Sequence, residues 1–401
     1  MCAGDSLGQT YDEAMSSDYA VRMRAYAAAH LPWDETMTVT WTDAEAKIQS
    51  EYTGGADGHA YGVTIHGEIR GAGESLEGAE PRLSTALGDV LPLIALSANA
   101  AVADPLMVAS HGLDLNSPQP FVGYRTPSAW EWFPQGRRLI DTDATLELMT
   151  AIGNHPQADL LIRAVESYRR ALQHWIPEQR LMAGEFLFIA AETLSRFLLE
   201  SRAQSRGMTP KNLARLRGAS SQDDLRRRYL TDEIFGTDND AFEAMEAASN
   251  GFEHGYMAVG DVRGLLEPVL ERSMGLVRRA LITEAGLPDA ARDRLLADEY
   301  EEPRGLVPMI AFVRGKLERV DAQLPAPEMP GADIELEWSN DRPIAERSED
   351  GEVSISFPFE ITYAKLPENT HVRSDGFGMR AAHFKRSDNA PLEVSVRRAA
   401  D

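Results

Sequence analysis

Residues 158–175 read ADLLIRAVESYRRALQHW, and their apolar side chains recur at the spacing of an α-helix. Steps of four, three, four and three residues separate Leu161, Val165, Tyr168, Leu172 and Trp175. Side chains at this spacing lie on one face of a helix, and such a face is stable when it packs against other apolar surface. The stretch therefore predicts an amphipathic helix that belongs to a helical bundle.

A second, more apolar helix is expected directly after the first, at about 178–202. It contains EFLFIAAETLSRFLLE, whose apolar residues surround most of the helix, so we expect it at the centre of the bundle. Pro177 separates the two helices, because proline ends one helix and suits the first turn of the next. Two shorter helices should follow, with Thr209 and Ser221 as their N-cap residues.

The last part of the bundle is predicted around the stretch SNGFEHGYM, residues 249–257. A helix from about residue 240 should end there, with Gly255 as its C-terminal glycine. Asp261 is expected to cap a further helix, in which Pro268 should cause a kink or shift the start downstream. The apolar stripe of the helix before the turn consists of Phe242, Met245, Ser249 and Phe252. Four principal helices with short connections predict an antiparallel bundle.

The segments on either side of the bundle alternate as β-strands do. Met37, Val39 and Trp41 alternate with threonines, and a second alternating run extends from Val353 to Tyr363. A helical stretch is also expected at about 310–320. The predicted fold class is α+β multidomain, with a β-rich or mixed N-terminal domain, a central all-α bundle and a small C-terminal β appendage. The corresponding ranges are 1–156, 157–325 and 326–401.

Composition limits the class of protein and the partners. The chain has 401 residues, of which 43% are hydrophobic, and a formal net charge of -23 from 40 basic and 63 acidic residues. This charge argues against a general attraction to nucleic acid, because phosphate binding needs local positive potential. Residues 157–283 are nearly neutral, however, with 17 basic and 18 acidic residues. A local nucleic-acid contact in this segment therefore stays open.

Cysteine content and hydropathy bear on compartment and cofactors. The single cysteine, Cys2, cannot form a disulfide framework or a cysteine zinc cluster within one chain, and a reducing cytoplasm fits this usage. We expect no metal and no cofactor. The first 30 residues have no continuous apolar segment of the kind found in secretory signals. The most apolar window, 89–109, is interrupted by proline, asparagine and aspartate, which favours a buried segment over a membrane span.

Taken together, the helical segments resemble a HEPN domain, most closely the ApeA-like group. The resemblance rests on the amphipathic RAVESYRRALQHW helix, the apolar EFLFIAAETLSRFL helix, and a helix that ends in SNGFEHG before an arginine-containing helix. It covers about 157–283. It implies a helical bundle that commonly forms dimers, and many members are metal-independent ribonucleases of toxin, stress or anti-phage defence systems.

The HEPN motif pairs an arginine with a histidine four to six residues later, often with a polar residue directly after the arginine. Histidine can move a proton at the ribose 2′-hydroxyl, and arginine can stabilise the developing phosphorane charge. His254 matches the motif histidine and Asn250 the polar position, but Ser249 stands where the arginine is expected. A neutral hydroxyl does not replace the guanidinium charge. Loss of one such group typically lowers the rate by ~100 to 1,000-fold.

Another arginine could complete the site. Arg263 follows His254 most closely, and Arg278 and Arg226 are further candidates. The resemblance thus gives His254, Asn250, Ser249 and Arg263 as candidate catalytic residues. Alternatively, His254 is a histidine at a helix C-terminus, where the last carbonyl groups favour its charged form.

Glu185 and Glu192 interrupt the most apolar predicted helix, and they lie seven residues apart on one face. A buried acidic pair could hold an arginine. Glu192, Arg196 and Glu200 recur at four-residue spacing, however, which favours a solvated, ion-paired stripe. The expectation is therefore that this face is exposed to solvent.

Two functions remain in view. The first is a non-catalytic binding or regulatory module that forms a homodimer through its helical bundle and is associated with RNA or with defence or stress systems. The second is a metal-independent ribonuclease of a toxin or anti-phage system, in which His254 acts with an arginine from elsewhere. The missing motif arginine and the acidic composition favour the first, and the nearly neutral central segment keeps the second open.

Overall fold

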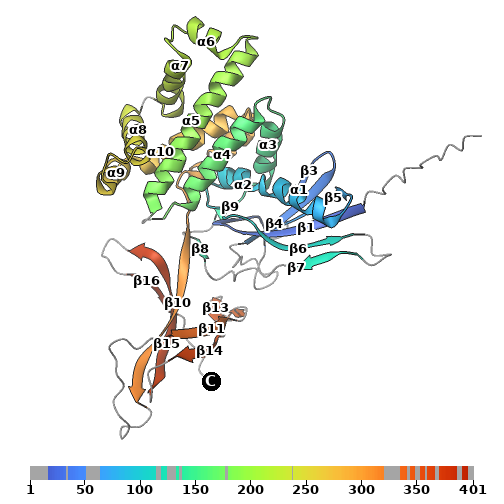
Figure 1. Cartoon of the computed structure of the whole chain (residues 1–401), viewed down its shortest axis with the longest axis vertical. Coiled ribbons are helices and arrows are strands. Elements are labelled where there is room, and N and C mark those ends of the chain that lie inside the picture. Colours follow the sequence, from blue (N-terminus) through green and yellow to red (C-terminus); the bar gives the residue numbers. More distant parts are fainter. Residues whose placement is uncertain are drawn as a thin grey trace, which may run out of the picture.

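A computed structural model shows that the chain has a mixed α+β fold, as predicted (Figure 1). Cys2 and Pro177 lie outside the residues that the structure describes. The described residues are 17–32, 35–50, 64–113, 119–123, 132–134, 138–176, 179–236, 238–319, 335–340, 344–347, 353–356, 359–365, 370–385 and 391–395.

An antiparallel sheet forms the N-terminal part, with the strand order β3-β4-β5-β1-β6-β7. Its strands are β1 (Ser17–Tyr26), β3 (Met37–Thr40), β4 (Ala44–Ser50), β5 (Thr64–Gly73), β6 (Leu106–Gly112) and β7 (Phe121–Gly123). In β1 and β5, Val21 lies opposite Ile69 and both side chains are fully buried. Helix α1 (Leu76–Gly88) packs on β1, β5 and β6, and Ser75 caps its first turn.

Helix α2 (Leu91–Ala98) joins the sheet region to the helical part. All its residues are buried, as predicted for the apolar window that contains it, and it packs against α3 and α4. The short strands β2 (Ala29–His30) and β9 (Arg138–Leu139) pair in parallel nearby. No helix in the described ranges is long and apolar enough to cross a bilayer.

The helical part follows. Its helices are α3 (Thr142–Gly153), α4 (Ala158–Gln173), α5 (Arg180–Ser205), α6 (Pro210–Leu216), α7 (Gln222–Tyr229), α8 (Asn239–Glu253), α9 (Val259–Leu266), α10 (Leu270–Glu284) and α11 (Asp289–Leu295). A π-helical turn, η3 (Leu230–Ile234), follows α7, and a 3-10 turn, η4 (Asp298–Tyr300), follows α11.

Helices α4 and α5 form the centre of this part. The predicted apolar face of α4 is confirmed, because Leu161, Val165, Tyr168 and Leu172 are fully buried and Trp175 directly after the helix is nearly so. Helix α5 contacts α4 and each of the helices from α6 to α10, which confirms its predicted central position (Figure 1). Thr209 and Ser221 cap α6 and α7, as expected from their hydroxyl groups.

The helix after the SNGFEHGYM turn differs in detail from the prediction. Asp261 does not cap it, because α9 already starts at Val259 and Asp261 lies in its first turn. Pro268 falls in the break between α9 and α10, as its missing backbone N–H predicts.

The C-terminal strands include one correction. Residues 310–320, which we expected to be helical, lie largely in the long strand β10 (Leu306–Arg319), since a short apolar run fits a strand as well as a helix. Strand β10 pairs with β8 (Trp132–Pro134) and β15 (Thr370–Lys385), and β15 pairs with β16 (Pro391–Ser395). Two further pairs join β11 (Glu335–Asn340) to β14 (Phe359–Lys365) and β12 (Ile344–Arg347) to β13 (Val353–Ser356).

Candidate functional site at the end of helix α8

The last turns of α8 and the turn that follows carry the predicted motif. Gly255 has a φ of 63°, a left-handed conformation that ends the helix as predicted. Gly251 is needed for packing, because a Cβ atom there would lie 2.3 Å from Sδ of Met257. The backbone conformation at Gly255 and the close packing at Gly251 therefore explain why both positions near His254 are glycine.

Ser249 lies inside the protein, between α8 and α5. Its residue surface is only 5% exposed, and its hydroxyl donates a 3.1 Å hydrogen bond to Oε2 of Glu185, which is also 5% exposed. The position of the expected motif arginine thus faces a buried carboxyl group of α5. The Ser249 hydroxyl has a partner inside the protein and is not presented to solvent.

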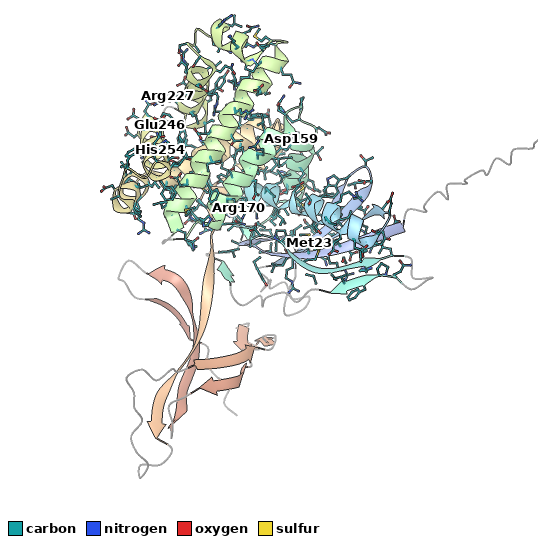
Figure 2. All side chains as sticks on the ribbon, viewed as in Figure 1. Met23, Asp159, Arg170, Arg227, Glu246 and His254 are labelled. Carbon is teal, nitrogen blue, oxygen red and sulfur yellow. The ribbon has the colours of Figure 1, made fainter. Side chains whose placement is uncertain are left out.

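His254 and Asn250 lie on a different side of α8 from Ser249. Successive residues of an α-helix are rotated by about 100°, so His254 lies about 40° from Asn250 but about 140° from Ser249. Both His254 and Asn250 are exposed, and Figure 2 shows His254 at the edge of the helical part. The His254 backbone N–H donates to the Asn250 carbonyl at 3.1 Å, which continues the helix. The structure therefore places His254 and Asn250 on one side of the helix end and Ser249 on another.

Arg263 lies on α9 and is exposed. Within the described part of the chain, no hydrogen bond, ion pair or ring contact joins an arginine to His254. Arg226 instead lies 3.5 Å from Asp223 and 3.4 Å from the Ser195 hydroxyl. In one subunit, no arginine among the described residues is fixed beside the histidine.

Arg278 is excluded as a replacement for the motif arginine. It is only 3% exposed, and its guanidinium donates to the backbone carbonyls of Leu96 at 3.0 Å, Ser97 at 2.8 Å and Leu295 at 2.7 Å. These bonds join α10 to the end of α2. Arg278 therefore has a structural role.

The expected exposure of the stripe on α5 is correct for Glu192 and wrong for Glu185, and the expected ion pairs of Glu192, Arg196 and Glu200 do not form among the described residues. Glu192 and Arg196 are exposed, whereas Glu185 is covered by α8. The pKa of Glu185 is raised to about 7. Burial is the main cause and the negative charge of Glu253 adds to it, whereas the hydrogen bond from Ser249 acts in the opposite direction. No cation among the described residues pairs with Glu185. An acidic residue inside an apolar helix was the sequence signal for this buried group.

Glu185→Gln should make the protein less sensitive to pH. The raised pKa means that the folded state prefers the protonated carboxyl group, so stability present below the unfolded value of 4.5 is lost as pH rises through about 7. The amide side chain of this variant keeps an acceptor for Ser249 but cannot ionise. Between pH 5 and 8, we expect wild type to lose about 2 kcal/mol relative to the variant in urea unfolding.

The matched control is Glu243→Gln, which removes one negative charge from the exposed side of α8. Its unfolding free energy should follow wild type across the same pH range. Parallel curves for wild type and Glu185→Gln would show that the Glu185 carboxyl group does not titrate in this interval.

Apolar side chains surround the motif on the protein surface. Ile189 of α5 is 37% exposed, Phe252 of α8 is 39% exposed, and Tyr256 and Val259 are 66% and 56% exposed. Phe252 therefore does not continue the buried stripe of α8, contrary to expectation. These residues lie on helices α5, α8 and α9, which contact one another, and on the turn between α8 and α9.

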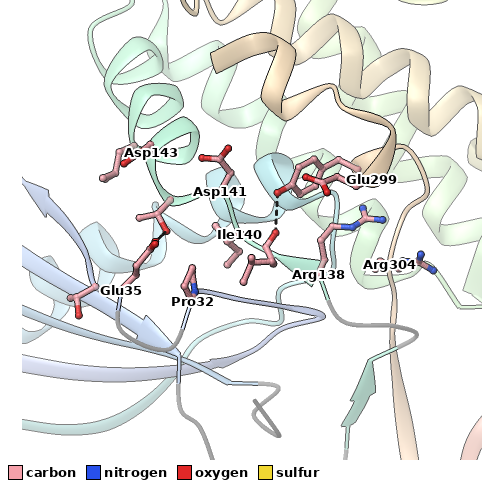
Figure 3. Close-up of a pocket in the computed structure, with 13 residues that line it drawn as sticks. Pro32, Glu35, Arg138, Ile140, Asp141, Asp143, Glu299 and Arg304 are labelled. Atoms are coloured by element: carbon pink, nitrogen blue, oxygen red, sulfur yellow. Dashed lines mark hydrogen bonds between the residues drawn. The ribbon is translucent and has the colours of Figure 1, made fainter. Parts of the chain in front are cut away.

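A separate pocket of about 820 Å³ lies near the start of α3 (Figure 3). Glu35, Asp141, Asp143 and Glu299 line it together with Arg138 and Arg304. Arg138 donates to the carbonyls of Ala98 and Asn99, and Arg304 pairs with Glu302 at 3.1 Å. Among the described residues, no group of three His, Cys, Asp or Glu side chains could hold a metal ion. The pocket therefore presents several carboxylates beside two arginines that are already engaged by protein groups.

Similarity to other proteins does not assign the site. Comparisons with protein-family models, with curated proteins and with solved structures gave no match. The candidate function therefore depends on the geometry of the residues around α5, α8 and α9.

Proposed function

We propose that the chain is a HEPN-like binding or regulatory module that forms a dimer through its helical bundle, lacks ribonuclease chemistry and acts in the cytoplasm together with RNA or with a defence or stress system. The helical arrangement supports this proposal, since an amphipathic α4 packs on a central α5 and a turn-ended α8 follows.

The observation that carries the proposal is the Ser249–Glu185 hydrogen bond. The position at which a HEPN ribonuclease has its arginine is occupied by a buried neutral hydroxyl that is held by a carboxyl group. Neither of these two side chains supplies a positive charge to stabilise a phosphorane. In addition, Glu253 and Glu192 are exposed in this region and would repel an RNA phosphate group.

The exposed apolar residues around the motif support dimer formation. Tyr256 and Val259 are more than half exposed in the single chain, and Phe252 and Ile189 are close to 40%. Grouped apolar side chains on a soluble protein commonly mark a contact with another protein surface. A second copy of the bundle would cover them.

The purified protein should leave RNA intact in EDTA and sediment as a dimer in analytical ultracentrifugation. His254→Ala should behave as wild type in both measurements, because an exposed histidine without a neighbouring cation has no catalytic role in this proposal. EDTA-resistant cleavage that disappears in His254→Ala would contradict the proposed loss of chemistry. A monomer at micromolar concentration would contradict the dimer.

The alternative function is a metal-independent ribonuclease in which His254 acts with an arginine of the second subunit. One observation favours it, since His254 and Arg263 are both exposed and have no side-chain partner among the described residues. In that case Arg263→Ala should abolish cleavage as completely as His254→Ala, while Arg279→Ala, on the exposed side of α10, should retain it.

A further inference from the structure

The segment 201–222 is basic within an acidic chain. It contains no acidic residue, because Glu200 precedes it and Asp223 follows it. Its basic residues are Arg202, Arg206, Lys211, Arg215 and Arg217. With a net charge of -23 for the chain, such a segment is a local exception in electrostatic potential.

Four of these cations lie exposed around helix α6 and form what we call the α6 patch: Arg206, Lys211, Arg215 and Arg217. Arg206 ends α5 and Arg217 ends α6, whereas Lys211 and Arg215 are four residues apart and share one face of α6. Leu213 and Ala214 are buried, which holds the helix on the protein. In Figure 1, α6 lies at the end of the helical part remote from the N-terminal sheet.

The α6 patch differs from the neighbouring arginines in having no carboxylate partner among the described residues. Arg227 pairs with Glu246, Arg228 lies 3.1 Å from Asp224, and Arg202 pairs with Glu233. None of the four patch side chains forms an ion pair or a hydrogen bond in the part of the chain that the structure describes. Their charge is therefore available to an external anion.

A pocket of about 550 Å³ opens beside the patch, between the end of α5 and the start of α6. Its lining combines amide and apolar side chains with the Thr209 hydroxyl and one carboxylate, Glu200, which can accept hydrogen bonds from the amino group of a base. The amides are Gln157, Gln204 and Asn212, and the apolar residues include Met208 and Pro210. Gln157 Nε2 donates to Gln204 Oε1 at 2.8 Å, which orients both amides. Amide groups can donate to and accept from the edge of an unpaired base.

We propose that the α6 patch binds single-stranded RNA, with phosphate groups on the four basic side chains and an unpaired base in the adjacent pocket. The positive charge of the patch accounts for binding a polyanion such as a single-stranded nucleic acid. Only the choice of RNA over single-stranded DNA rests on the proposed function. A membrane surface fits less well, because Leu213 and Ala214 of α6 are buried and Leu216 is its one exposed large apolar side chain. The RNA-binding surface is thus distinct from the motif at His254.

The test is the binding of a fluorescently labelled, unstructured 15-nucleotide RNA, measured by anisotropy over a series of salt concentrations. The double variant Lys211→Glu, Arg215→Glu should bind RNA about tenfold more weakly or worse. The negative slope of the logarithm of the binding constant against the logarithm of the salt concentration should become less steep by about 1.4, because two phosphate contacts are lost. The control is Arg163→Glu together with Arg279→Glu, which changes the net charge equally at exposed sites on α4 and α10. It should bind close to wild type.

Asn212→Ala tests the pocket. It should weaken RNA binding without changing the salt slope, because it removes an uncharged contact. Three results would contradict RNA binding at the α6 patch. The wild-type protein could fail to bind the RNA, it could bind DNA of the same sequence or vesicles of anionic lipid more tightly, or the control variant could lose as much affinity as the patch variant. If the protein binds RNA through the patch and also cleaves it, RNA binding at the patch is supported and the proposed loss of ribonuclease chemistry is contradicted.

Discussion

Arg278→Met is expected to lower the free energy of unfolding by about 3–5 kcal/mol, enough to unfold many domains of this size at physiological temperature. Helix α2 is buried along its whole length, so its last carbonyl groups cannot reach water. The Arg278 guanidinium satisfies those of Leu96 and Ser97 and a third carbonyl at Leu295. Methionine fills a similar volume but leaves the buried carbonyls of Ser97 and Leu295 without this donor, and Leu96 keeps only the 3.3 Å bond from the Asn99 backbone N–H.

Arg279→Met is the matched control, because the neighbouring arginine on α10 is exposed and has no side-chain partner among the described residues. It should change stability by less than about 0.5 kcal/mol. Arg278→Lys keeps a cation but loses the planar arrangement of donors, so its loss of unfolding free energy should lie between those of Arg278→Met and Arg279→Met. Urea unfolding measures all three. A loss below about 1 kcal/mol in Arg278→Met would mean that water reaches the end of α2.

Local pattern was sufficient for most of the helical part. The apolar face of α4 follows from spacing, the central position of α5 follows from apolar residues around most of its circumference, and Thr209 and Ser221 cap helices because a hydroxyl group suits an N-cap. Gly255 ends α8 since its backbone is left-handed. These features depend on neighbours within about four residues, which the sequence displays directly.

Features set by partners distant in the sequence were not predicted. Strand β10 forms because β15 pairs with it, and its short apolar run does not distinguish a strand from a helix. Glu185 is buried because α8 covers it, although the two helices are 64 residues apart at Glu185 and Ser249. A four-residue charge spacing could not show which helix would lie over that face.

The candidate site shows the same limit. His254 and Asn250 could be placed on one face of a helix end from sequence, but the burial of Ser249 in the interior required knowledge of α5. Arg278 was a candidate for the phosphate site because arginine is the right chemical type, and only the structure shows that α2 uses it. The basic segment that holds the α6 patch is visible in the sequence, but the pairing of Arg202 with Glu233 is not. The absence of acidic residues in segment 201–222 was visible in the sequence.

Asn99→Ala is the second change with a large expected effect, about 3–4 kcal/mol of unfolding free energy. Asn99 is fully buried with a left-handed backbone, φ 47° and ψ 48°. Its amide donates to the carbonyls of Tyr300 at 2.8 Å and Glu301 at 3.0 Å, and its Oδ1 accepts from the Tyr168 hydroxyl at 2.7 Å. Alanine would lose these bonds and adopt the left-handed conformation at additional cost.

The two causes of this loss can be separated. Asn99→Gly adopts the left-handed backbone readily, so it should be more stable than Asn99→Ala by about 1 kcal/mol while still lacking the hydrogen bonds. Tyr168→Phe should cost about 1–2 kcal/mol in wild type, because it leaves Oδ1 of Asn99 without its donor. In the Asn99→Ala background the same change should cost almost nothing, since the hydroxyl has already lost its acceptor. Additive losses in this double-mutant cycle would show that the Tyr168–Asn99 bond does not connect α4 to the end of α2.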